Sequence, residues 1–378
     1  MQYTRREIGK LALAVPAAGL LPVRLLAQTK PNSKFEGVQI GTITYSYRSM
    51  PDQSAEATLK YIVDSGISAI ELMGGPVESF AGAPTMGGRG GRGGGAGGGR
   101  AGGGREGRGR GGPDPATLTA SWNGVPCAPA RRGDEPAPPG AGRRGGGGGR
   151  GEMTPEQQAA QQEQAAKLKA WRTSVSMDPF KKLRQMYNDA GVTIYAWKQL
   201  SLNMSDEEFE YIFNVAEALG CTHTTLELPT DAAQLKRLGD FAMKKKIYAA
   251  YHTHTQGSMT AFDQAFALSK GNMANVDFGH WVAAGNVGGT SMQFLEKYHD
   301  RISSFHLKDR TKPEHCALNL PWGTGETPIG EILQLVKKNR WNIPASVELE
   351  YDIPDGSDAV KEVHKCVEYC RTALTART

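Results

Sequence analysis

The segment NVDFGHW, which runs from Asn275 to Trp281, follows a short apolar run and carries Asp277 and His280 three residues apart. Two further apolar runs, SSFHLKDR and ASVELEYD, also end in polar side chains: His306, Lys308 and Asp309 in the first, Glu348 and Glu350 in the second. In a parallel barrel, the side chains at the C-terminal ends of the strands converge and form the active site. An Asp, a His and a Glu brought together there favour a divalent cation. A polar residue satisfied at a strand end would explain one such segment better than three in series.

Alternation of strands and helices indicates the fold. Short runs rich in apolar and β-branched residues lie at 38–45, 68–73, 192–197, 223–228, 247–254, 273–278, 301–307 and 344–351. Amphipathic helical stretches fill the intervals, with Ser205 as a candidate N-cap and Gly66 and Gly220 as stop signals. Eight strands alternating with helices over roughly 250 residues predict an α/β (β/α)8 TIM barrel. A doubly wound open sheet is the alternative, but its site would lie at one switch point rather than on adjacent strands.

A long insertion interrupts this pattern after the second strand. Residues 81–151 are dominated by Gly, Arg and Pro, so the barrel is expected over 35–80 and 152–378, with the helix resuming at Thr154. Such a composition cannot bury enough apolar surface to offset the entropy of ordering, which predicts disorder. The segment TLTASWNGVPCAPA within it could fold locally. Arg-Gly repeats can bind RNA, but no aromatic residues interleave here, so no nucleic-acid partner is expected.

The N-terminus indicates export. Residues 1–27 resemble a twin-arginine signal, because Arg5 and Arg6 precede an apolar stretch and Ala27 offers a small residue for cleavage. We therefore expect a periplasmic protein with no membrane partner after signal removal, a basic amphipathic helix being the alternative. Outside the insertion the net charge of +5 largely disappears, so no basic surface is implied. Five cysteines without zinc-type spacing do not indicate a disulfide framework, and Cys366 and Cys370 are expected on one apolar helix face.

The strand ends TLELP, YHTH, VDFGH, FHLKDR and VELEYD resemble the sugar phosphate isomerase/epimerase barrels of the xylose-isomerase-like superfamily. That group includes inosose dehydratase, tagatose-type 3-epimerases and relatives acting on 3-keto-glycosides. The resemblance covers about 35–374 without the insertion, and its more specific parts are DxxH, HxKD and the WGTGE run from Trp322 to Glu326.

The resemblance implies a divalent metal, commonly Mn2+, held by two Glu, one Asp and one His. Mg2+, Co2+ and Zn2+ are alternatives. On this chain Asp277 matches the aspartate, His306 the histidine, and Glu350 or Glu348 the last glutamate. The two glutamates lie two residues apart on one strand face, and Glu350 is slightly favoured as nearer the strand end.

The fifth strand departs from the pattern, since AYHTHTQ offers His252 and His254 where the family has its first glutamate. Either His254 replaces that ligand or Glu227 reaches in from the fourth strand. An epimerase needs two opposed acid/base groups, whereas isomerisation or β-elimination needs one base and one acid, a role that suits histidine. His254 or His252 is therefore expected near the reacting carbon.

Five more residues receive expected roles. His280 would orient a substrate hydroxyl, and Lys308 would contact an oxyanion or pair with a carboxylate. Trp281 and Arg310 would bind substrate, with Asp309 anchoring the loop that contains Arg310.

The leading expectation is a metal-dependent sugar isomerase or epimerase that acts on a keto-sugar through an enediolate. A lyase or dehydratase acting on 3-keto-glycosides or inosose-like polyols is the alternative. Export argues against phosphorylated substrates. An endonuclease-like phosphodiesterase with a three-zinc cluster and a non-catalytic sugar-binding barrel are less favoured, and a homo-oligomer is compatible with the sequence.

Overall fold

The computed structural model describes residues 30–84, 121–122, 125–126 and 154–376. Within the compact unit Pro31–Thr378, eight parallel strands form a closed barrel. They are β2 (Val38–Ile43), β3 (Ala69–Met73), β6 (Thr193–Lys198), β7 (His223–Glu227), β8 (Tyr248–His252), β9 (Asn272–Asp277), β10 (Ile302–Leu307) and β13 (Ala345–Val347). Pairing of β2 with both β13 and β3 closes the ring, with Thr42 opposite both Val347 and Ile70. The predicted barrel is confirmed, and the open doubly wound sheet is excluded.

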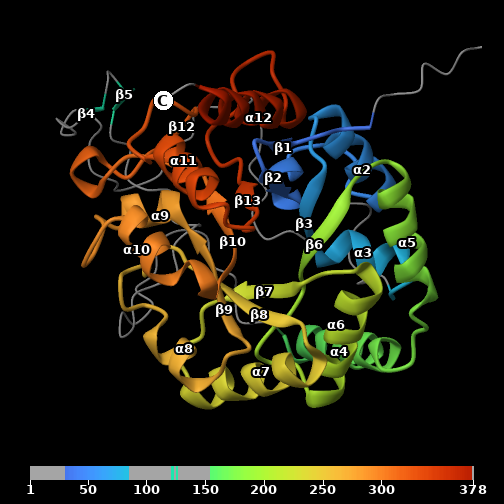
Figure 1. Cartoon of the computed structure of the whole chain (residues 1–378). Helices are drawn as coiled ribbons and strands as arrows, with labels where there is room; N and C mark the ends of the chain where they lie inside the picture. Colours follow the sequence, from blue (N-terminus) through green and yellow to red (C-terminus); the bar gives the residue numbers. More distant parts are fainter. Residues whose placement is uncertain (1–29, 85–120, 123–124, 127–153, 377–378) are drawn as a thin grey trace, which may run out of the picture. The chain divides into compact units, whose positions relative to one another are not determined.

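Helices surround the strands in the order that the sequence pattern predicts (Figure 1). The helices are α2 (Ala55–Asp64), α3 (Gly74–Phe80), α4 (Pro155–Arg172), α5 (Asp178–Asp189), α6 (Asp206–Leu219), α7 (Ala232–Lys245), α8 (Asp263–Leu268), α9 (Phe278–Ala283), α10 (Ser291–Tyr298), α11 (Ile329–Asn339) and α12 (Ala359–Thr375). Smaller pieces are the strands β1 (Lys34–Phe35), β11 (Asp309–Arg310) and β12 (Asn319–Leu320), and the 3-10 turns η1 (Thr44–Tyr47), η3 (His299–Arg301) and η4 (Pro313–His315).

Local capping signals begin and end these helices where expected. Ser205 forms a capping box with Glu208 at the start of α6, and Gly220 ends that helix with a φ of 79°, a left-handed conformation that favours glycine. Thr154 forms a second capping box at the start of α4, which confirms the predicted resumption of the helix.

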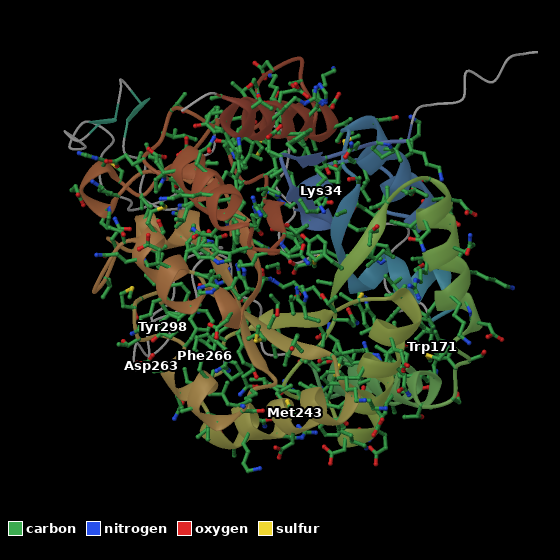
Figure 2. The ribbon with its side chains drawn as sticks, in the orientation of Figure 1. Lys34, Trp171, Met243, Asp263, Phe266 and Tyr298 are labelled. Atoms are coloured by element: carbon green, nitrogen blue, oxygen red, sulfur yellow. The ribbon has the colours of Figure 1, made fainter. Side chains whose placement is uncertain are left out.

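The outer layer is joined by aromatic contacts between neighbouring helices. On α10, Tyr298 donates a hydrogen bond from its hydroxyl to Asp263 Oδ1 of α8 at 2.9 Å and packs on Phe266, with 5.3 Å between ring centroids (Figure 2). Beneath them, Trp281 of α9 is fully buried against Phe294, with ring centroids 4.8 Å apart. Such contacts fix α9, which carries part of the site, against the barrel.

The two chain segments that flank the insertion are tied together by buried charge. The guanidinium of Arg172, in the last turn of α4, donates from Nε and Nη2 to both carboxylate oxygens of Glu78 in α3, at 2.8 and 3.1 Å. Its Nη1 donates to Glu208 of α6 at 3.1 Å, and all three residues are buried. A bidentate arginine-carboxylate contact of this kind fixes geometry as well as supplying energy.

Most of the 81–151 insertion and the predicted export signal lie outside the described residues. The exception is a two-stranded hairpin of β4 (Ser121–Trp122) and β5 (Val125–Pro126), which confirms local folding in that segment. Within the described part of the chain, no helix is long and apolar enough to cross a membrane.

The cysteines depart from the sequence-based expectation at one position. Cys316 is disulfide-bonded, whereas Cys221, Cys366 and Cys370 are free and buried. Cys127 lies outside the described residues. The prediction for α12 is confirmed, since Cys366 and Cys370 both lie on its buried face.

Candidate active site

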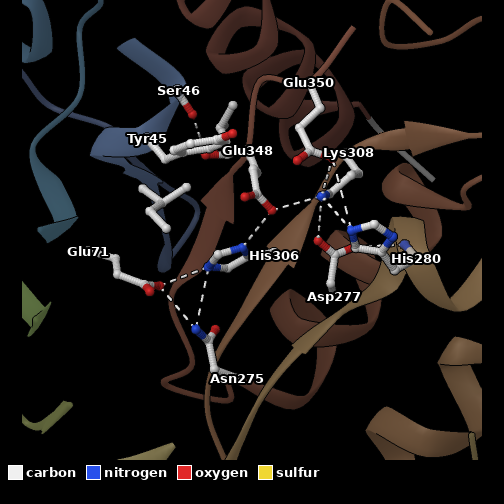
Figure 3. Close-up of polar contacts among 12 residues, drawn as sticks. Tyr45, Ser46, Glu71, Asn275, Asp277, His280, His306, Lys308, Glu348 and Glu350 are labelled. Atoms are coloured by element: carbon white, nitrogen blue, oxygen red, sulfur yellow. Dashed lines mark hydrogen bonds and ion pairs between the residues drawn. The ribbon is translucent and has the colours of Figure 1, made fainter. Parts of the chain in front are cut away.

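The candidate site lies at the C-terminal end of the barrel strands, where their register brings polar side chains to one level (Figure 3). In that register His306 of β10 is opposite Asp277 of β9, and His252 of β8 is opposite Asn275. Glu348 follows β13 directly. The strand ends predicted to converge therefore do so.

Four of these residues form a buried group that could hold a metal ion. One ligand atom from each of His252, Asp277, His306 and Glu348 lies within 4.8 Å of the others. Burial lowers the pKa of His252 well below its ordinary value, so the ring is neutral, as a metal ligand must be. One buried atom of the group, His252 Nδ1, makes no hydrogen bond, and Asp277 Oδ2 faces the ammonium group of Lys308 at 3.1 Å. An unpartnered buried nitrogen and two carboxylates within a mixed nitrogen and oxygen donor set fit a divalent cation.

His306 is held between two carboxylates. Its Nε2 lies 2.8 Å from Glu71 Oε2, and its Nδ1 lies 3.0 Å from Glu348 Oε2. Burial lowers the pKa of His306, but the charges of both carboxylates raise it by more, to about 10. Burial raises the pKa of Glu71, but the charge of His306 and the hydrogen bond to its ring lower it by more, to about 2. Without a metal, an imidazolium therefore lies between two carboxylates.

Glu71, the middle residue of β3, is a site residue that sequence reasoning missed. It is fully buried and also accepts hydrogen bonds from Thr225 Oγ1 at 2.6 Å and Asn275 Nδ2 at 3.1 Å. The segment AIELM offers one signal, a carboxylate inside a short apolar strand, because a charge buried there needs a partner. A carboxylate on the far nitrogen of a metal-binding histidine orients the ring and raises its basicity.

The ammonium group of Lys308 contacts three carboxylates at once (Figure 3). Its Nζ lies 3.1 Å from Asp277 Oδ2, 2.8 Å from Glu348 Oε2 and 2.6 Å from Glu350 Oε2. Burial raises the pKa of Asp277 while Lys308 lowers it, with a net value of about 6. The nearby carboxylates outweigh burial and raise the pKa of Lys308, so its ammonium group is charged.

His280 lies in the first turn of α9, which Asp277 caps by accepting the backbone N–H of His280 at 2.7 Å. Its ring contacts Lys308 Nζ through Nε2 at 3.0 Å and Arg310 Nη1 through Nδ1 at 2.5 Å. Burial, with Lys308 and Arg310, lowers the pKa of His280 well below its ordinary value. The neutral ring thus lies between two cations.

His254 and Glu227 form a separate pair at the mouth. Glu227 Oε2 lies 3.2 Å from His254 Nδ1, and Glu227 Oε1 accepts a hydrogen bond from Lys198 at 3.1 Å. Neither residue belongs to the four-residue group, where His252 instead stands at the fifth strand. His254 does belong to a second candidate group, which it forms with His252 and His280.

For three further sequence-based assignments, the positions in the structure differ in how well they agree with the expected roles. Glu348 belongs to the metal group, whereas Glu350, which was slightly favoured, contacts Lys308. Trp281 lies in the core and donates a hydrogen bond from Nε1 to Gly289 O at 3.0 Å, so its buried ring gives no support to a role in substrate binding. Asp309 anchors the WGTGE loop by accepting backbone N–H groups of Gly323, Thr324, Gly325 and Thr327.

Comparison with known proteins points to one family. Residues 171–370 match the family model described as xylose isomerase-like TIM barrel. A sugar phosphate isomerase/epimerase from Parabacteroides distasonis is similar in fold, with 14% identity over 90% of this chain and 96% of that chain and a TM-score of 0.52. The probable 3-DHS dehydratase AsbF of Bacillus anthracis, involved in petrobactin synthesis, has 11% identity over 90% and 100% of the chains and a TM-score of 0.50. No curated protein matches significantly.

Proposed function

The chain belongs to the xylose isomerase-like TIM barrel family, and from that premise we propose that it is a divalent-metal-dependent sugar isomerase or epimerase acting on a keto-sugar through an enediolate. One observation carries the proposal. It is the buried group of His252, Asp277, His306 and Glu348 at the C-terminal end of the barrel, in which His252 Nδ1 makes no hydrogen bond. Carboxylates and imidazoles together suit Mn2+, with Mg2+, Co2+ or Zn2+ as alternatives.

A bound divalent ion would act as a Lewis acid on a carbonyl and an adjacent hydroxyl of the substrate. This would acidify the C–H proton on the carbon that bears the hydroxyl. The protein's own part is to present the ligands with fixed orientation. Glu71 holds the ring of His306, and the backbone N–H of His280 holds the carboxylate of Asp277. Preorganised groups of this kind cost no rearrangement when the substrate arrives.

His254 is the proposed general base. Its ring lies beside those of His252 and His280, at centroid distances of 5.1 and 4.8 Å, and its side chain is 23% exposed, so a substrate can reach it. Glu227 beside Nδ1 orients the ring and leaves Nε2 to accept a proton from the carbon next to the carbonyl.

Among the site histidines that the structure describes, only His254 has an accessible side chain, so isomerisation or β-elimination fits better than inversion by two opposed bases. Elimination on a 3-keto-glycoside or an inosose-like polyol is therefore the second candidate function. From the twin-arginine pattern we also propose that the enzyme acts in the periplasm, on a carbohydrate that is not phosphorylated.

The test is incubation of the metal-loaded protein with keto-sugars and 3-keto-glycosides in heavy water, followed by mass spectrometry and NMR. Deuterium entering next to the carbonyl, with an aldose or an eliminated product appearing, supports the proposal. Clean C3 inversion that survives substitution of His254 would instead indicate an ordinary epimerase. Full activity in the presence of chelator would contradict metal dependence.

A further inference from the structure

We propose that Lys308 is a built-in counter-cation of the metal-binding carboxylates, and that an incoming divalent ion displaces its ammonium group onto Glu350. The inference rests on the metal site of the proposed function. It assigns different roles to two residues in contact. Lys308 competes with the ion for the carboxylates, and Glu350 is the release point, the carboxylate that receives the displaced ammonium group.

Competition follows from the shared atoms. The Nζ of Lys308 contacts Asp277 Oδ2 and Glu348 Oε2, at 3.1 and 2.8 Å, and both carboxylates belong to the four-residue metal group. An ion bound by these oxygens would lie within a few ångströms of the ammonium charge, where two cations in a buried site repel strongly. Ion and ammonium therefore cannot share the carboxylates.

Glu350 provides the place to which the ammonium group can move. It lies 2.6 Å from Nζ, closer than either ligand carboxylate, and it is absent from the metal group. The contact with His280 does not hold the lysine in place, because a neutral imidazole has one lone pair and its two nitrogens face two cations, Lys308 and Arg310. Of the two Lys308 partners outside the metal group, Glu350 and His280, Glu350 therefore binds the ammonium group more strongly.

The rest of the lysine side chain is confined. A Cβ added to Gly279, in the first turn of α9, would lie 2.2 Å from Lys308 Cγ and 2.6 Å from its backbone oxygen. The glycine thus leaves space that the lysine stem fills. With the stem packed there, rotation about the terminal bonds is enough to carry Nζ from the ligand carboxylates to Glu350.

Two consequences follow. The metal-free protein keeps its buried carboxylates neutralised, so it folds without an ion. The ion is bound more weakly than its four ligands alone would allow, because binding must displace Lys308.

The first experiment measures Mn2+ affinity without any sugar, by titration followed through the EPR signal of the free ion. Lys308→Met keeps the stem and removes the charge, and it should bind Mn2+ about tenfold more tightly or better. Lys236→Met is the control, since Lys236 pairs with Asp240 on the exposed surface of α7, and its affinity should stay within about twofold of wild type. Unchanged or weaker binding by Lys308→Met overturns the proposal.

The second experiment is a double-mutant cycle with Glu350→Gln. In the wild-type background this change removes the release point, so Lys308 stays on the ligand carboxylates and Mn2+ affinity should fall. In the Lys308→Met background it should have no effect. An equal loss in both backgrounds would make Glu350 a metal ligand and would overturn the proposal.

Stability measurements cover the case in which Lys308→Met folds poorly without metal. Its melting temperature should rise more on adding Mn2+ than that of wild type, since the ion replaces the missing charge. An equal rise in both proteins counts against the proposal. Failure of the proposed function would be distinct, because it would appear as Mn2+ binding that follows these rules without turnover of any sugar.

Discussion

Glu71 and His306 lie 235 residues apart in the sequence, yet Glu71 Oε2 lies 2.8 Å from His306 Nε2 inside the barrel. The other nitrogen of that ring faces Glu348 and the metal group. Glu71 therefore sets which nitrogen of His306 is available to a metal. Without a metal, the carboxylates keep the ring in its imidazolium form.

Glu71→Gln should lower divalent-metal affinity by about 10- to 100-fold, as the loss of a carboxylate behind a metal-binding histidine does elsewhere. Isothermal titration with Mn2+ measures this. Thr225→Val, which removes a hydrogen bond to the other oxygen of Glu71, is the control and should cost much less. Equal affinity in Glu71→Gln and wild type would contradict the orienting role.

Asp277→Asn should lose most of the bound metal while the protein stays folded. The amide oxygen can still accept the N–H of His280 and cap α9, so only the charge needed by the ion is removed. Asp277→Ala should lose the cap as well and be less stable than the Asn variant by about 1 kcal/mol. Metal analysis and thermal unfolding of both variants provide the check, and an Asn variant that retains the ion would remove Asp277 from the ligand set.

His254→Gln should lower turnover by about 100- to 10,000-fold, the range that a general base contributes, while metal content stays unchanged. His252→Gln should lose metal along with activity, because His252 belongs to the four-residue group. Turnover and metal content measured on the same preparations separate the two roles. If His254→Gln loses the ion too, His254 is a ligand rather than the base.

Arg172→Met should reduce the free energy of unfolding by about 3–5 kcal/mol, because it removes the cation that neutralises the buried carboxylates of Glu78 and Glu208. Lys167→Met, which breaks an exposed ion pair with Glu163, should cost at most about 1 kcal/mol. Urea unfolding compares the two. Similar small losses would show that the chain around the insertion does not depend on this cluster.

The metal-free protein should lose stability as the pH rises from about 6.5 to about 10. The pKa of His306 is raised from 6.5 to about 10 in the folded state, so its contribution is complete below the lower value and lost above the higher one. One proton gives a slope of at most about 1.4 kcal/mol per pH unit. Urea unfolding in chelator should show this slope in wild type beyond that of His306→Gln, and identical slopes would contradict the buried imidazolium.

Much of the site was predictable because its residues stand at strand ends, and strand ends are marked locally. Asp277, His306 and Glu348 follow apolar runs of strand length, and parallel strands bring such positions together. Glu71 lies inside its strand rather than at the end, and its role depends on His306, which long-range folding brings to it. His252 was expected as a base rather than a candidate ligand, because a sequence gives no distance to the other three members of its group.

The choice between Glu348 and Glu350 shows where sequence reasoning reaches its limit. The rule that residues two apart share a face holds along a strand, but β13 ends at Val347, so both glutamates lie beyond it. Beyond the strand, the local turn of the backbone places Glu348 against His306 and Glu350 against Lys308 and His280.

The sequence by itself determined the barrel, the helix boundaries and the end of the barrel at which the chemistry lies, because periodicity, capping and strand length are properties of neighbouring residues. Tertiary structure alone decided that Glu71 holds His306, that Lys308 lies on the metal carboxylates and that Trp281 belongs to the core. The physical reason is that the charge and the hydrogen bonds of a buried group depend on atoms tens to hundreds of residues away, whose distances are set only when the barrel closes.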